Sequence, residues 1–259
     1  MLPIIHIGPL AIQFPGLILL LGLWLGLSLA EKYAQNHHVT PNQVYSVSFA
    51  ALFAAGAAAR LVYVIRHIST FVQNPVGIFA LKPDLLDPWG AFLGVGLVAL
   101  YFTRRYKLNP WDLADALAPV LAVMMIAIHL ANLASGDGYG APSNVPWAIF
   151  LLGEWRHPTQ IYELIASGVV LFYFWPGSRR ARFNTAGRLS LSIVAATAGC
   201  RLFFEAFHGD SPIISGGLRS TQLTAWLIMA LAFWMLSRQS RPAVINNSEQ
   251  PPSNKNTPG

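Results

Sequence analysis

The sequence predicts an all-α protein that crosses a membrane about seven times. Of its 259 residues, 54% are hydrophobic and only 11% are charged, whereas soluble domains carry about 25% charged residues. The hydrophobic residues gather in runs close to the roughly 20 residues that a helix needs to cross a bilayer. Two of these runs contain an arginine, Arg60 in the second and Arg201 in the sixth. Together these observations indicate a polytopic membrane protein with polar groups inside its helix bundle.

Seven apolar segments are long enough, or nearly so, to be membrane-spanning helices. We expect them at residues 10–30, 44–66, 88–103, 113–134, 160–176, 187–208 and 220–237. The second consists mostly of Ala and Gly at residues 50–59, a composition that favours close helix packing. Asn109 and Pro110 are typical of a helix start, which gives Asp112 and Asp115 ordinary capping roles in the same helix.

The basic residues outside the apolar segments predict the orientation of the chain. Eleven Lys and Arg residues fall on one side of the membrane and four on the other, and the side richer in Lys and Arg is the cytoplasmic one. The N-terminus is therefore expected outside and the C-terminus in the cytoplasm. We expect residues 1–237 to form one domain. Residues 238–259, rich in Ser, Asn, Pro and Gln, are expected to form a disordered cytoplasmic tail.

Polar side chains recur at one depth, near the outer ends of the helices. Counted along each helix at 1.5 Å per residue, they lie roughly 3–11 Å below the outer surface. A buried guanidinium group in hydrocarbon costs from a few to about ten kcal/mol unless it meets an anion or water. This layer therefore predicts a site for a negatively charged group, and a phospholipid headgroup is the obvious candidate. Its members are Arg60, His129, Asn132, Glu163, Arg201 and Gln222.

The same residues also have structural interpretations. His129 and Asn132, spaced i, i+3, share a helix face and are equally explained by a hydrogen bond that joins two helices. Arg201 and Glu205, spaced i, i+4, can form an ion pair within one helix. Tyr162 can be an interfacial anchor. Spacing alone leaves these alternatives open.

Other chemistries find less support in the sequence. The basic residues are spread over short loops, so nucleic-acid binding does not follow from the formal charge of +6. No cluster of His, Cys and carboxylate residues has the spacing of metal ligands, and neither a metal nor another cofactor is expected. An intramembrane serine protease using Ser135 lacks a second motif that places a histidine opposite it. A proton-coupled transporter lacks an internal repeat.

Several stretches resemble the prolipoprotein diacylglyceryl transferase family, and the likeness runs up to about residue 237. The most specific is residues 156–163, Arg-His-Pro-Thr-Gln-Ile-Tyr-Glu, which nearly repeats the family's Arg-His-Pro-Ser-Gln-Leu-Tyr-Glu. Residues 59–64 are similar to its Gly-Ala/Gly-Arg-Leu/Ile-Gly-Tyr-Val motif, and residues 201–207 to Arg-Phe/Ile-x-x-Glu-Phe-Phe. Residues 129–140 occupy the place of Arg-Ile/Leu-Gly-Asn-Phe-Ile-Asn-Gly-Glu-Leu-Tyr/Trp-Gly, and residues 7–17 look like the family's N-terminal strand and first helix start.

This resemblance implies an enzyme that moves a diacylglyceryl group from phosphatidylglycerol to the cysteine thiol in the lipobox of lipoprotein precursors. The reaction would take place at the outer face of the bacterial cytoplasmic (inner) membrane. The partners would be phosphatidylglycerol, lipobox-containing prolipoproteins and membrane lipid. The alternative is a paralogue that keeps the lipid pocket and binds lipid or lipoprotein precursors without transfer.

Carried over position by position, the resemblance assigns roles to the polar layer. Arg201, with Arg60 or Arg156, would neutralise the phosphate of the departing glycerol phosphate. His129 would take the proton from the cysteine thiol, whose ordinary pKa of about 8.5 leaves little thiolate at neutral pH. The expected catalytic residues are His129, Arg201 and Asn132. The expected substrate-binding residues are Arg60, Tyr63, Asp137, Gly140, Arg156, His157, Gln160, Tyr162, Glu163, Glu205 and Gln222.

The sequence departs from the family at positions where its activity is usually placed. The family's His-Gly-Gly reads Trp-Gly-Ala from Trp89, and the arginine before its Gly-Asn pair is His129. The tyrosine of its Trp/Phe-Tyr-Gly motif is Pro15. Asp137 for Glu and Ser135 for Asn are milder changes. These differences are the reason to weigh the binding-only paralogue against the transferase.

Overall fold

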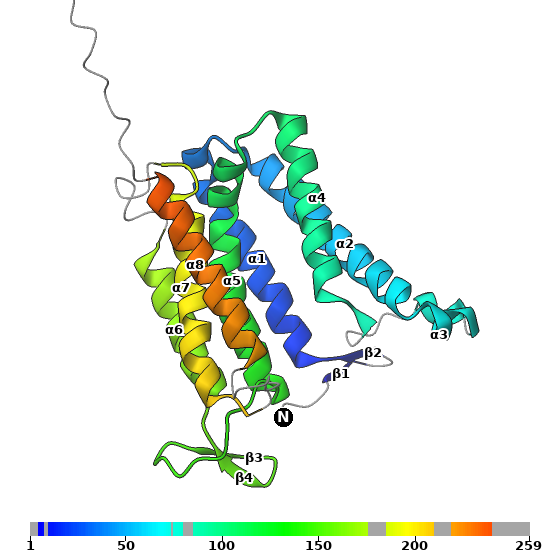
Figure 1. The fold of residues 1–259 in the computed structure, drawn as a ribbon, viewed down its shortest axis with the longest axis vertical. Coiled ribbons are helices and arrows are strands. Elements are labelled where there is room, and N and C mark those ends of the chain that lie inside the picture. The colour runs from blue at the N-terminus through cyan, green and yellow to red at the C-terminus, as the bar shows by residue number, and fades with distance from the viewer. Residues whose placement is uncertain are drawn as a thin grey trace, which may run out of the picture.

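The computed structural model describes residues 5–7, 10–73, 75–79, 85–175, 185–209 and 219–239. This part of the chain is a helix bundle with two small β-hairpins (Figure 1). The long helices are α1 (Phe14–Ala34), α2 (Pro41–Arg66), α4 (Pro88–Tyr106), α5 (Pro110–Ser135), α6 (Thr159–Tyr173), α7 (Arg188–Phe204) and α8 (Ser220–Gln239). The shorter elements are α3 (Ile68–Gln73), the 3-10 turns η1 (Gln35–His37), η2 (Pro75–Phe79) and η5 (Glu205–Phe207), and the strands β1 (Ile5–Ile7), β2 (Leu10–Ile12), β3 (Ile149–Leu151) and β4 (Glu154–Arg156).

Each of the expected apolar segments coincides with one of the long helices. Within the described residues, 5 helices (α1, α2, α5, α7 and α8) are long and apolar enough to cross a membrane, whereas α6 has only 15 residues. The chain is therefore a polytopic membrane protein, as predicted. The first helix begins at Phe14 rather than at residue 10, because residues 10–12 pair with residues 5–7 in an antiparallel hairpin.

Some sequence-based expectations fall outside the described residues. These are the end of the fifth segment at residue 176, the basic residues at 82, 179, 180 and 182 that helped to predict the orientation, and the expected tail from residue 240 onward.

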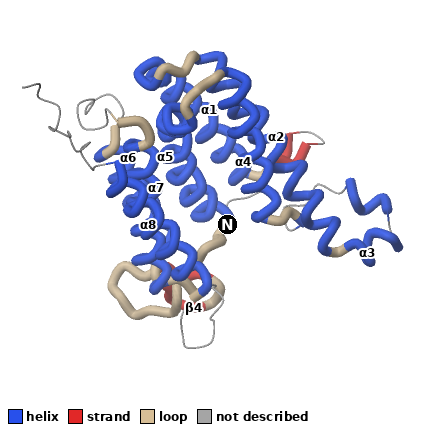
Figure 2. Tube along the Cα trace, turned by 45° about the horizontal axis from the view of Figure 1, so that its top comes forward, coloured by secondary structure: helices blue, strands red, loops and turns tan. Residues whose placement is uncertain are grey.

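Helices α1 and α5 form the middle of the bundle, with α6, α7 and α8 on one side and α2 and α4 on the other (Figure 1 and Figure 2). The most extensive helix contacts are those of α1 with α5, α2 with α4, and α7 with α8. The β3–β4 hairpin lies beyond the helix ends, where α5 finishes and α6 begins (Figure 1). Helices α5 to α8 therefore form one group, from which the α2–α4 pair leans away.

Glycines let the closest helix pairs approach each other. A Cβ atom at Gly90 of α4 would lie 2.5 Å from the carbonyl oxygen of Ala58 on α2, and one at Gly94 would overlap the carbonyl of Ala54. In the α1–α5 contact, a Cβ at Gly22 would overlap a side chain of α5. The prediction of close packing along residues 50–59 is therefore confirmed, with glycines supplied by the partner helix.

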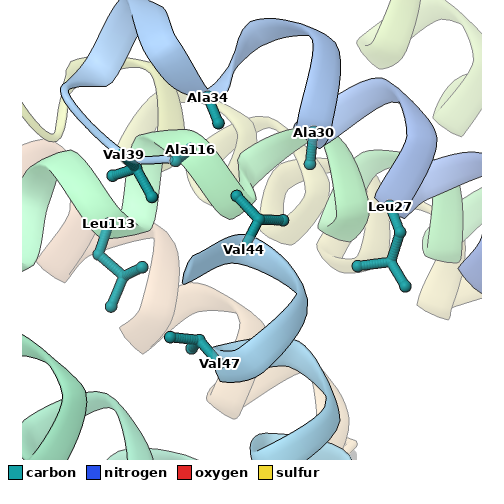
Figure 3. Packing of buried hydrophobic residues seen from close by; sticks show 8 residues of the cluster. All are labelled: Leu27, Ala30, Ala34, Val39, Val44, Val47, Leu113 and Ala116. Carbon is teal, nitrogen blue, oxygen red and sulfur yellow. The ribbon is translucent and has the colours of Figure 1, made fainter. Parts of the chain in front are cut away.

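An apolar core fills the end of the bundle opposite the β3–β4 hairpin. It joins the last turns of α1 to the first turns of α2 and α5, so it ties together three helices near their connecting loops. Figure 3 shows its fully or nearly fully buried members, Leu27, Ala30, Ala34, Val39, Val44, Val47, Leu113 and Ala116.

Asp115 is fully buried and caps a different helix from the one expected. Its carboxylate accepts hydrogen bonds, each 2.7 Å long, from the backbone N–H groups of Gly187 and Ser190 at the start of α7. The expectation of a cap within its own helix is wrong, because beyond the first turn the helical N–H groups already have intrahelical partners. Asn109 does cap α5, through the N–H of Trp111.

Candidate functional site

A buried carboxylate on α6 contacts an arginine and a histidine from two neighbouring helices. Glu163 lies one turn into α6 and is 4% exposed. Its Oε1 accepts a hydrogen bond of 2.8 Å from Nη1 of Arg201 on α7. Its Oε2 lies 3.2 Å from Nδ1 of His129 on α5. A carboxylate removed from water needs such partners, so part of the predicted polar layer meets where α5, α6 and α7 join.

Arg201 is shared between two buried carboxylates. Besides contacting Glu163, its Nη2 lies 2.9 Å from Oε2 of Glu205. Glu205 is fully buried, and its Oε1 accepts a hydrogen bond from the hydroxyl of Thr221 on α8. The Arg201 side chain nevertheless remains 36% exposed. Arg201 is therefore the most exposed member of a group whose carboxylates are buried.

His208 lies in the same place and is absent from the sequence-based prediction. It follows η5, is 1% exposed, and places Nε2 3.5 Å from Oε2 of Glu163 and 3.3 Å from Nη1 of Arg201. One signal points to it, since a residue seven positions after Arg201 falls on the same helix face. We call His129, Glu163, Arg201, Glu205 and His208 the Glu163 cluster.

The loop that follows α5 is held beside this cluster by backbone contacts on both sides. The N–H of Ala141 donates to the carbonyl of Phe207 at 2.8 Å, and the N–H of His157 donates to the carbonyl of Ala141 at 3.1 Å. Gly140 forms a β-bridge with His208. Glycine is required at this position, because a Cβ atom would overlap the carbonyl oxygen of His157.

Side chains at the start of α6 fasten the same loop. The hydroxyl of Thr159 donates to the carbonyl of Gly138 at 2.8 Å, and the amide of Gln160 donates to the carbonyl of Asp137 at 3.0 Å. Both donors are buried, at 0% and 1% exposure. The structure therefore brings together the predicted substrate-binding residues of this range, beside the Glu163 cluster. They are Asp137, Gly140, Arg156, His157 and Gln160.

Arg156 and Tyr162 hold the β3–β4 hairpin and the chain before it against the loop after α5 and the start of α6. Arg156 donates from Nη1 to the carbonyl of Gly140 at 3.2 Å and from Nη2 to Oε2 of Glu154 at 2.8 Å. The hydroxyl of Tyr162 accepts a hydrogen bond of 2.6 Å from the indole N–H of Trp147. The Nη atoms of Arg156 and the hydroxyl of Tyr162 therefore contact loop residues rather than the Glu163 cluster.

Arg60 is placed apart from Arg201. Its guanidinium group lies 5.8 Å from the ring centroid of Tyr63 and belongs to α2, which leans away from α6 to α8 (Figure 1). Its donors bind the backbone carbonyl oxygens of Gly77, Ile78 and Leu85. Among the described contacts Arg60 shares no partner with Arg201, contrary to the expectation of a common arginine cavity. Equal depth along the helix axes does not bring the two helices together.

Asn132 and Ser135 belong to the end of α5. The side-chain amide of Asn132 packs beside Gly138, under the loop. The hydroxyl of Ser135 donates to Oδ2 of Asp137 at 2.6 Å. Within the described part of the chain no histidine contacts this hydroxyl, so the serine protease interpretation gains no support.

The remaining sequence-predicted positions lie at helix starts. Gln222 accepts a hydrogen bond of 3.4 Å from the N–H of Arg219 at the beginning of α8. Trp89, which stands in place of the family's histidine, is 67% exposed, and its N–H is capped by Asp87. Pro15 lies in the first turn of α1. None of these contacts reaches the Glu163 cluster in the described residues.

Buried carboxylates around an accessible arginine, enclosed by membrane-crossing helices, define the class as a polytopic membrane protein with an internal polar site. The family model described as prolipoprotein diacylglyceryl transferase matches residues 3–238. The chain belongs to the prolipoprotein diacylglyceryl transferase family, which confirms the resemblance found in the motifs.

Relatives named phosphatidylglycerol–prolipoprotein diacylglyceryl transferase align over most of the chain. The protein of Synechococcus elongatus is 28% identical over 90% of this chain and 84% of its own length. That of Rhizobium meliloti is 29% identical, covering 91% and 90% of the two chains. That of Bordetella parapertussis is 31% identical, covering 78% and 79%. The enzyme class implied by the motifs, a diacylglyceryl transferase, is thereby confirmed.

Proposed function

We propose that this protein transfers the diacylglyceryl group of phosphatidylglycerol to the lipobox cysteine thiol of lipoprotein precursors, at the outer face of the cytoplasmic membrane. Family membership supplies the reaction class, and the names of the relatives supply the donor and the acceptor. The observation that carries the proposal is the Glu163 carboxylate, which holds Arg201 and His129 side by side. A substrate at this point meets a cation and a base together.

Arg201 binds the phosphate of the lipid in this proposal. Two carboxylates contact its guanidinium group, but its 36% exposure leaves a side open to an anion. The demand for positive charge grows during the reaction, because a phosphodiester with one negative charge departs as a phosphomonoester with about 1.5 to 2. Fixed donors aimed at charge that develops in the transition state are the usual source of such stabilisation.

His129 takes the thiol proton. The Glu163 carboxylate beside Nδ1 favours a proton on that atom, which leaves Nε2 as the acceptor. The sulfur then forms a bond to the glyceryl carbon while the bond from that carbon to the phosphate oxygen breaks, and glycerol phosphate leaves. Asn132, one turn along α5 from His129, orients the lipid through its amide.

The Glu163 cluster lies near the outer membrane surface in this proposal. We include α4 and α6 among the membrane crossings, which gives seven helices with the C-terminus in the cytoplasm. The excess of 11 basic residues over four supports this orientation. The ends of α5 and α7 and the start of α6, which carry the cluster, are then all on the outer side.

A transfer assay tests the function. The purified protein is reconstituted with phosphatidylglycerol and given a lipobox peptide with one cysteine, and mass spectrometry follows the diacylglyceryl adduct on the thiol. We expect adduct formation, and a fall in kcat of about 100-fold or more for His129→Gln, as for the loss of a general base. Binding of lipid and peptide without any adduct would instead establish the binding-only paralogue, which the departures from the family at Trp89, His129 and Pro15 favour.

A further inference from the structure

His208 has no part in the reaction described so far, although it contacts both the partner of the base and the arginine that binds phosphate. One oxygen atom, Oε2 of Glu163, lies 3.2 Å from Nδ1 of His129 and 3.5 Å from Nε2 of His208. Within the described residues Nδ1 of His129 makes no hydrogen bond, and this oxygen is the nearest acceptor among its described contacts. The same Nε2 lies 3.3 Å from Nη1 of Arg201. A single carboxylate oxygen therefore separates two imidazole rings, and the second ring adjoins the phosphate site.

The surroundings of His208 fix which of its nitrogens can accept a proton. Nδ1 faces the carbonyl oxygen of Phe204 at 3.2 Å, and a carbonyl only accepts, so Nδ1 carries a hydrogen. Nε2 faces an N–H donor of Arg201, so in the neutral ring it presents its lone pair. Nε2 is thus the basic atom, and it is also the atom nearest to the Glu163 carboxylate.

The positive and negative side chains around His208 balance each other, so a bound anion would be compensated by one additional proton. Helix α7 and η5 contribute Arg201 and Glu205, α6 contributes Glu163, and α5 contributes His129. Arg219, at the start of α8, donates to the backbone carbonyl of His208 itself. Two carboxylates therefore balance two guanidinium groups, and an imidazolium compensates the additional charge of a bound phosphate.

We propose that His129, Glu163 and His208 form a proton relay that carries the thiol proton to the departing phosphate. This proposal rests on the transferase function proposed above. The thiol proton passes to Nε2 of His129, the Nδ1 proton of His129 passes to Oε2 of Glu163, and that carboxyl proton passes to Nε2 of His208. His208 then protonates an oxygen of the glycerol phosphate held by Arg201.

The relay balances the reaction without another reactant. The sulfur–carbon bond forms and the carbon–oxygen bond of the phosphodiester breaks, while one proton leaves the thiol and one reaches the phosphate. Glu163 and His208 return to their starting states. His129 ends as its other tautomer, and exchange with water restores it.

His208→Gln tests the relay in the full-length protein, with phosphatidylglycerol and the lipobox peptide as substrates. A glutamine amide offers Arg201 an oxygen acceptor but cannot carry a proton. We expect kcat to fall about 100-fold with little change in the KM for phosphatidylglycerol. The matched control is His67→Gln: His67 also sets Nδ1 against the carbonyl four residues earlier, that of Tyr63 at 3.0 Å, but it is exposed and outside the cluster. Its kcat should be unchanged.

A proton inventory, the rate measured in mixtures of H2O and D2O, gives a second readout. It should be curved in the unchanged protein, because several protons move, and linear in His208→Gln. A linear inventory in the unchanged protein overturns the relay even if His208→Gln does not fold.

The outcomes separate the relay from the function on which it rests. If His208→Gln keeps its kcat, or changes KM alone, while His129→Gln loses about 100-fold or more in kcat, then the relay is wrong and the transferase function stands. If the unchanged protein forms no adduct, both proposals fall together.

Discussion

At the scale of single residues, two buried carboxylates and, in the proposed function, the phosphate of the lipid compete for the guanidinium group of Arg201. Glu163 and Glu205 are nearly or fully buried, so each depends on the guanidinium group to offset its loss of hydration. The planar fork of an arginine spans both carboxylates with separate nitrogens, at 2.8 Å and 2.9 Å, and still leaves donors for a third partner.

Arg201→Lys should show that this fork, and not charge alone, is required. A lysine keeps the positive charge but cannot reach both carboxylates and a phosphate at once. We expect kcat/KM in the transfer assay to fall about 100-fold. The control is Arg66→Lys, because Arg66 pairs with Asp87 at 2.7 Å from a mostly exposed position on α2. Similar losses in the two variants would contradict a special role for Arg201.

The sequence predicts part of this site and misses part of it, for a geometrical reason. Depth along the helices correctly grouped Glu163, His129 and Arg201, because their helices are neighbours. Depth says nothing about lateral position, so Arg60 was grouped with them although α2 leans away. His208 is the last residue of the expected sixth helix, so depth along that helix does not group it with Glu163. In the structure α7 ends at Phe204, and His208 follows η5 and contacts Glu163.

At the scale of secondary structure elements, two helix interfaces are formed by close approach at glycines rather than by interlocking large apolar side chains. Gly90 and Gly94 set α4 against the backbone of α2, and Gly22 lets α1 approach the side chain of Ala127 on α5. Apolar side chains are as well accommodated by lipid as by protein, so the hydrophobic effect does not drive helices together within the membrane. Close packing of the helix backbones stabilises their association instead.

Two glycines on one helix make this testable. A Cβ atom at Gly94 would overlap the backbone of α2, whereas one at Gly96 would meet nothing within 4 Å. We expect Gly94→Ala to lower the free energy of unfolding by about 1–3 kcal/mol through overpacking. Gly96→Ala should be neutral or raise it by up to about 1 kcal/mol, because alanine favours helix. Thermal unfolding in detergent measures both, and equal Tm values would refute the contact.

Element positions were largely predictable, and element partners were not. Apolar length locates the long helices within a few residues. The start of α1 at Phe14 and the cap that Asp115 gives to α7 depend on contacts with residues distant in the sequence. Local sequence patterns do not indicate such long-range contacts, so which elements contact each other is seen only in the three-dimensional structure.

At the scale of the whole molecule, the proposed orientation puts the β3–β4 hairpin and the Glu163 cluster on one side and the apolar core of Figure 3 on the other. Basic residues cluster at the helix ends beside that core, for example Arg104 and Arg105 at the end of α4. An enzyme that receives exported precursors has its site on the side that they reach.

Cysteine labelling tests this orientation. Cys200→Ala removes the one native cysteine, and a single cysteine is then placed at Asn144, before the hairpin, or at Gln35, in η1; both side chains are exposed. A membrane-impermeant thiol reagent added to cells with a permeabilised outer layer should label Asn144→Cys directly. Gln35→Cys should react only after the cytoplasmic membrane is opened. The reverse pattern would invert the topology.

The loop after α5 is fixed mainly by its main chain, whose N–H and carbonyl groups bond to Phe207, His157, Thr159 and Gln160. Peptide groups are common to all residues, so most side chains there can be exchanged without moving the frame. Ser135 and Asp137 illustrate this freedom, since both differ from the family motif on an intact turn. Substitutions can therefore change the side chains that this loop presents while its backbone contacts with α6 and η5 stay the same.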